Sequence, residues 1–130
     1  MAMTFEYDEI AGQGIRKIIA SWTTDTEGAA AGTTKKIAGE LIKAVTNPTD
    51  EPTDDYNVTI TDSDGVNVLT ACVLDLQDRD TSNTEEVYFN LSDGGGTELA
   101  LAAFPVVCSP LTITIDSAGS TKSGVATIYY

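Results

Sequence analysis

Histidine does not occur anywhere in this 130-residue sequence. Its absence excludes Ser-His-Asp and Cys-His nucleophiles, the zinc-binding helix of metalloproteases and an imidazole base that works near neutral pH. A pair of carboxylates, as in glycosidases, is the remaining enzyme alternative, but no two acids lie in a sequence context that would separate their pKa values. We therefore expect a protein that is not an enzyme, with no catalytic residues, no cofactor and no metal.

Positive charge and long apolar runs are also scarce. The sequence has 7 Lys and Arg residues against 20 Asp and Glu residues, a net charge of -13, which disfavours nucleic-acid and anionic membrane partners. Its longest apolar stretch, Leu99–Cys108, contains Pro105 and is far shorter than the roughly 20 residues that cross a bilayer. Met1–Gly14 is acidic and lacks a cationic start followed by an apolar run, so we expect no secretory signal there.

Cysteine occurs only twice, at Cys72 and Cys108. Two widely spaced cysteines are too few for a disulfide scaffold, and they do not form a CxxC metal or redox motif. Because each has apolar neighbours, we expect two buried, reduced thiols rather than a disulfide.

Alternation of apolar and polar residues is the dominant pattern in the sequence. A period of two predicts β-strands with one buried face. Two hairpins are expected, Tyr56–Val68 around a Ser63–Gly65 turn and Leu111–Tyr130 around a Ser117–Gly124 turn. Further strands are expected at Ile15–Trp22 and Val87–Leu91.

The segment Lys35–Val45 is ambiguous between helix and strand. Ile37, Leu41 and Val45 recur every four residues, as on a helix, but they also fit alternate positions of a strand. Gly39 in the middle of the segment weakens a helix, which favours the strand.

Together these patterns predict an all-β fold: one antiparallel β-sandwich or small barrel at residues 15–130. At most one or two short helical turns are expected, at Val66–Leu76 and Leu99–Phe104. Residues 1–14 end at a flexible Gly-containing joint, Gly12–Gly14, and form either an N-terminal arm or an edge strand.

Acidic clusters raise the question of a metal site. Asp62–Gly65 resembles the start of an EF-hand loop, but Ala71 stands where the bidentate Glu is needed, so a turn bonded to its own backbone is favoured. The acids between Asp75 and Glu86 are expected to form a solvated loop.

Partner contacts are expected from the few cations and from the N-terminal segment. If Thr23–Thr34 is a hairpin connection, Arg16–Lys17 and Lys35–Lys36 share a patch that could dock an acidic partner; ordinary pairing with Glu6, Asp8 or Glu40 is the alternative. The candidate partner-binding residues are therefore Phe5, Tyr7, Ile10, Arg16, Lys17, Lys35 and Lys36.

Several sequence blocks, taken together in their order and spacing, resemble short virion structural proteins of tailed bacteriophages. The blocks are Ile15–Ile18 with Ser21–Thr23, Gly32–Ile37, Pro52–Tyr56, Asp64–Val66, Asp78–Thr81 and Leu111–Ile113. The resemblance covers the chain from about residue 5 onward, and none of the blocks is specific by itself.

This resemblance implies a virion protein made in the host bacterial cytoplasm, with capsid decoration or cement as its role. The implied partners are the major capsid protein or another virion protein and further copies of the chain, with a trimer natural at three-fold sites. A tail or head-to-tail connector component and a host- or carbohydrate-binding β-sandwich module are the alternatives.

Overall fold

A computed structural model describes residues 2–10, 12, 14–50, 52, 55–92 and 103–130. It contains eight strands and no helix in this part of the chain: β1 (Ala2–Asp8), β2 (Lys17–Thr23), β3 (Ala30–Glu40), β4 (Lys43–Pro48), β5 (Asn57–Thr61), β6 (Glu85–Tyr88), β7 (Val106–Asp116) and β8 (Ser123–Tyr129).

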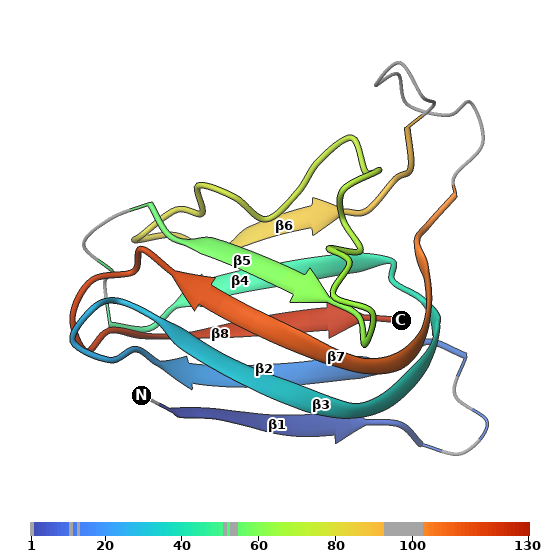
Figure 1. The fold of residues 1–130 in the computed structure, drawn as a ribbon, viewed down its shortest axis with the longest axis horizontal. Coiled ribbons are helices and arrows are strands. Elements are labelled where there is room, and N and C mark those ends of the chain that lie inside the picture. The colour runs from blue at the N-terminus through green and yellow to red at the C-terminus, as the bar shows by residue number, and fades with distance from the viewer. Residues whose placement is uncertain (1, 11, 13, 51, 53–54, 93–102) are drawn as a thin grey trace.

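The strands form two antiparallel sheets that pack face to face (Figure 1). One sheet has five strands in the order β1-β2-β8-β4-β6, and the other has three in the order β3-β7-β5. The two sheets do not close into a barrel. The predicted all-β sandwich is therefore confirmed.

From β2 onward, the chain changes sheet at every connection between successive strands. The expected Leu111–Tyr130 hairpin is wrong, because β7 and β8 belong to different sheets and their connection is an arch between them. The Thr23–Thr34 connection is an arch for the same reason, since β2 and β3 lie in different sheets. In the expected Tyr56–Val68 hairpin, the first arm is β5, but the second arm is reduced to a bridge between Thr61 and Asn67.

The segment Lys35–Val45 is extended, as favoured, but it is divided between two strands. The N–H of Leu41 donates to Pro105 O beside the three-stranded sheet at 2.9 Å, while the N–H of Ile42 donates to Tyr129 O in the five-stranded sheet at 2.8 Å. These two bonds mark the point where the chain crosses from β3 to β4. Val66–Leu76 forms successive turns, and Leu99–Phe104 lies mostly outside the described residues.

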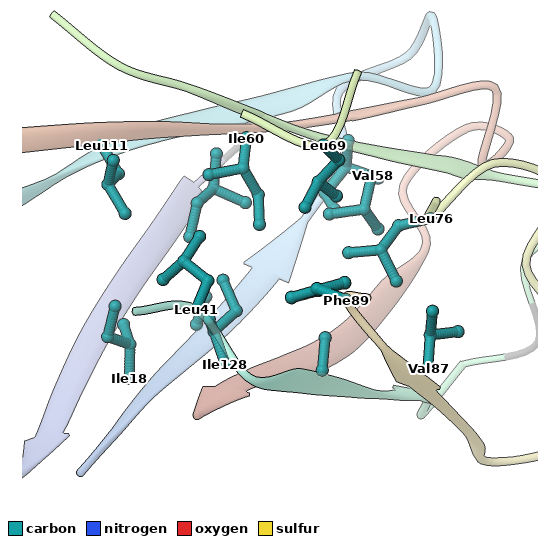
Figure 2. Close-up of a cluster of buried hydrophobic side chains, with 14 of the residues drawn as sticks. Ile18, Leu41, Val58, Ile60, Leu69, Leu76, Val87, Phe89, Leu111 and Ile128 are labelled. Carbon is teal, nitrogen blue, oxygen red and sulfur yellow. The ribbon is translucent and has the colours of Figure 1, made fainter. Parts of the chain in front are cut away.

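The core fills the space between the two sheets, as Figure 2 shows. Alternate residues of each strand enter it, so β8 buries Ala126 and Ile128, and β7 buries Ile113 and Ile115. The fully buried Tyr56 packs against the ring of Trp22 at a centroid distance of 5.3 Å. Trp22 is therefore a core residue.

The two cysteines are free, but the expectation that both are buried is wrong. Val107 occupies the inward position of β7, which turns the next residue, Cys108, outward and leaves it exposed. Cys72 is half-buried, its Sγ lies 3.9 Å from Phe89 O, and burial raises the pKa of its thiol.

In the native protein at pH 8, iodoacetamide is expected to label Cys108 at least about ten-fold faster than Cys72, because thiolate content and access control the rate. Peptide mass spectrometry over a time course measures both rates, and labelling in denaturant, where the rates should converge, is the control. Equal native rates, or a chain two mass units lighter than the reduced protein, would contradict this assignment.

Candidate interaction surface

The N-terminal candidates lie on β1 and in the connection that follows it. β1 pairs with β2 over its whole length, from Ala2 opposite Thr23 to Asp8 opposite Lys17. Phe5 and Tyr7 are partly buried against the core, and their rings stack at a centroid distance of 6.4 Å. Ile10 follows the strand and is 72% exposed.

Tyr7 joins β1 to β3. Its hydroxyl accepts the N–H of Lys35 at 3.0 Å, and the Lys35 ammonium lies 4.6 Å from the centre of its ring. Lys35 also forms an ion pair with Glu9. These contacts tie the end of β1 to the three-stranded sheet.

The four predicted cations do not form one patch. Arg16 lies 4.6 Å from the ring centre of Tyr130 and donates to Ala38 O at 3.2 Å, whereas Lys17 points to the outer face of the five-stranded sheet. Lys36 is exposed on β3, in the other sheet. The shared patch required β2 and β3 to be hairpin neighbours, and they are not.

Instead, the outer face of the five-stranded sheet carries a cross-strand row of alternating lysines and tyrosines. Lys17 of β2 lies opposite Tyr129 of β8, Tyr129 lies opposite Lys43 of β4, and Lys43 lies opposite Tyr88 of β6. We call these four residues the lysine–tyrosine row. Neighbouring positions on the same strands, including Ile18, Ala44, Val87 and Ile128, point inward and are buried.

Cation–π contacts hold the row together. The Lys43 Nζ lies 4.8 Å from the ring centre of Tyr129 and 5.3 Å from that of Tyr88, and the Lys17 Nζ lies 5.9 Å from the Tyr129 ring. These distances are within the roughly 6 Å over which a ring quadrupole attracts a cation. The lysines are therefore pre-ordered against the rings.

An ion pair orients Lys43 within the row. The Lys43 Nζ lies 2.5 Å from Glu86 Oε1, and this hydrogen bond raises the pKa of Lys43 and lowers the pKa of Glu86. Both groups are exposed enough for solvent to screen the pair, so its main effect is to orient Lys43. Tyr88 is 48% exposed and is the most accessible ring of the row.

Sequence reasoning missed Lys43, Tyr88 and Tyr129 as candidate site residues. Each occupies an outward strand position next to a buried residue, a signal that the alternation already contained. Their alignment into one row depends on the register between β2, β8, β4 and β6, which no local pattern specifies.

The acids that were considered as metal ligands accept hydrogen bonds from neighbouring backbone N–H groups instead. The Asp62 carboxylate accepts the N–H groups of Asp64 and Val66 at 2.9 and 3.0 Å, as the turn interpretation predicted. Asp80 accepts the N–H groups of Ser82 and Asn83, which lowers its pKa. Within the described ranges, no three His, Cys, Asp or Glu side chains gather closely enough to hold a metal ion.

A shallow hollow lies over β2 and β8, away from the lysine–tyrosine row. Its volume is about 360 Å³, and much of its lining is hydroxyl-bearing: Thr4, Ser21, Thr23, Thr49 and Ser123. The Thr23 and Ser123 hydroxyls lie 3.2 Å apart in hydrogen-bond contact. Trp22, Gly124 and Val125 complete the lining, so the hollow combines hydroxyl groups with apolar surface.

No protein-family model matches the chain, and no curated protein or solved structure is significantly similar to it. A helix able to span a membrane is not found among the described residues.

Proposed function

We propose that this chain is a non-enzymatic virion structural protein of a tailed bacteriophage, which decorates the capsid and stabilises the head by bridging capsid subunits. The sequence resemblance supports the class, and the lysine–tyrosine row supplies the binding surface. A decoration protein adds interface area between neighbouring shell subunits. Because it binds the assembled shell and not the free subunits, its binding stabilises the assembled shell.

The lysine–tyrosine row is the observation that carries the proposal. Tyrosines rank among the residues that contribute most to protein interfaces, because a rigid ring buries a large area and its hydroxyl can hydrogen-bond. The lysines beside them add charge that orients an acidic partner surface. Since all four residues lie on one sheet face, a flat shell surface can contact them together.

The test is binding to capsids stripped of this protein. The wild-type chain is expected to bind and to raise the temperature at which the capsids release DNA, whereas a Lys43→Ala/Tyr88→Ala variant should bind at least about ten-fold more weakly. A Lys36→Ala variant, altered on the other sheet, is the matched control and should bind like wild type. Unchanged melting temperatures of the isolated variants establish that they are folded.

Wild-type protein that does not bind capsids would contradict capsid decoration. Electron micrographs of particles carrying the labelled chain would then distinguish a tail or head-to-tail connector location.

The hydroxyl-lined hollow favours a second candidate function, that of a carbohydrate-binding module. Binding of neutral oligosaccharides, weakened by Ser21→Val or Ser123→Val and unaffected by Lys43→Ala/Tyr88→Ala, would support it. The absence of binding on a glycan array together with capsid binding would exclude it.

A further inference from the structure

The four sheet edges of the sandwich differ in how they are protected. Proteins normally block exposed edge strands with proline, lysine, a bulge or a covering segment, because unpaired N–H and C=O groups recruit another strand. The edges here are β1 and β6 in the five-stranded sheet and β3 and β5 in the three-stranded sheet.

Three of these edges are short, irregular or covered. A loop covers β5, through hydrogen bonds that join Val58 N to Leu76 O, Val68 N to Ile60 O and Arg79 N to Tyr56 O. β3 has a register irregularity between Thr33 and Lys36, where the Tyr7 hydroxyl receives the Lys35 N–H. β6 is only 4 residues long.

β1 lacks most of these protections, and its only charged residues are Glu6 and Asp8. Its 7 residues contain no proline and no lysine, and its register with β2 is unbroken from Ala2 to Asp8. In the described part of the chain, the only backbone hydrogen bonds of β1 are those with β2. Figure 1 shows β1 along the margin of the molecule. β3 packs against one face of β1, where Gly32 lies beside Met3 and Phe5, but it does not pair with the free edge of β1.

The side chains of β1 are also only half covered. Met3, Phe5 and Tyr7 face the core side of the sheet but stay partly buried, because no strand flanks them on the outer side. On the other face, Thr4 and Glu6 are exposed. A further strand beside β1 would therefore cover apolar surface on one face and meet polar groups on the other.

We propose that this strand is β1 of a second copy of the chain, antiparallel to the first and related to it by a two-fold axis at Phe5. This register pairs all 7 residues of the strand. It places Phe5 opposite Phe5 and Met3 opposite Tyr7 on the core side, and Thr4 opposite Glu6 on the outer side.

Charge and periodicity select this register. A shift of one residue would place Glu6 on the face of Phe5, because side chains alternate with a period of two. An axis at Glu6 would set the two Glu6 carboxylates against each other, which is unfavourable. With the axis at Phe5, each Glu6 faces a neutral threonine and each Asp8 lies opposite Ala2, so the acids of a strongly acidic chain are kept apart.

The test is a charge series at Thr4, measured by sedimentation equilibrium on the purified chain. Thr4 is exposed and lies opposite the neutral Ser21 within its own chain, so its charge acts mainly across the proposed interface. The two-fold axis creates two equivalent contacts between position 4 of one copy and Glu6 of the other. Thr4→Glu places like charges in both contacts and should raise the dimer Kd about five-fold or more, whereas Thr4→Lys places opposite charges there and should lower the Kd. Adding Glu6→Lys to Thr4→Glu should restore dimerisation.

Cysteine pairs test the register itself, in a chain with Cys72 and Cys108 replaced by serine. An equimolar mixture of Thr4→Cys and Glu6→Cys chains should form the mixed disulfide faster than either chain forms its own, because only positions 4 and 6 face each other directly.

A wild-type chain that stays monomeric at about 1 mM, a concentration that detects even weak association, would overturn the proposal. An oligomer whose Kd is the same in Thr4→Glu and Thr4→Lys would overturn it as well, because its interface would lie elsewhere. These measurements use the purified chain alone, so they succeed or fail independently of capsid binding.

Discussion

Replacing Gly124 by alanine is expected to lower the free energy of unfolding by about 2–3 kcal/mol or more, as overpacking of a filled core does. Gly124 lies opposite Trp22 across the β2–β8 pair, and an added Cβ would lie 2.3 Å from Trp22 Cζ2 and 2.7 Å from Cε2. The Trp22 ring cannot move aside easily, because Trp22 is only 2% exposed and its ring packs against Tyr56.

Thermal and urea denaturation of the Gly124→Ala variant measure this effect, and a melting temperature lower by about 10 °C is expected for a domain of this size. Gly14→Ala is the matched control, since an added Cβ there meets nothing within 4 Å. It should change stability by no more than about 0.5 kcal/mol. Equal melting temperatures for the two variants would show that Trp22 does not occupy this position against β8.

Deleting Ala2–Ala11 is expected to lower the melting temperature by about 10 °C. The deletion removes a 7-residue strand with its ladder to β2, together with the partly buried Met3, Phe5 and Tyr7. Three half-buried apolar side chains correspond to about 3 kcal/mol of lost burial. The deletion also removes the contacts that Tyr7 makes with Lys35.

The control is a chain in which a Gly/Ser segment of equal length replaces Ala2–Ala11. It separates the loss of β1 from the loss of chain length, and it should have the same melting temperature as the deletion variant. The contrary result is a truncated chain that melts at the wild-type temperature but no longer binds its particle. The segment would then act as an arm that grips a neighbouring subunit, which is the alternative that the sequence left open.

Local patterns in the sequence predicted most of the strands and, where apolar and polar residues alternate clearly, which side of the strand faces the core. At Leu111–Ile115, the alternate apolar residues Leu111, Ile113 and Ile115 are buried, as the alternation predicts. The turn at Asp62 was equally predictable, because a carboxylate that bonds the N–H groups two and four residues later needs only neighbouring residues.

The same patterns gave wrong predictions for the burial of Cys108 and for the hairpin at Leu111–Tyr130. Val107 and Cys108 are both compatible with burial, and only the packing of β7 decides that valine points inward. A polar turn between two alternating segments fits a hairpin within one sheet and also an arch between two sheets. The sequence from Leu111 to Tyr130 therefore does not distinguish them, although the connection between β7 and β8 is an arch.

The sequence by itself determined the all-β class, the acidic surface and the alternation of inward and outward side chains, because these depend on composition and on a period of two within each strand. Only the tertiary structure decided which sheet each strand joins and in which register. Those choices rest on hydrogen bonds between strands far apart in the chain, such as β2 with β8 and β4 with β8. Lys17, Tyr129, Lys43 and Tyr88 form a single row for this reason, although the sequence separates them widely.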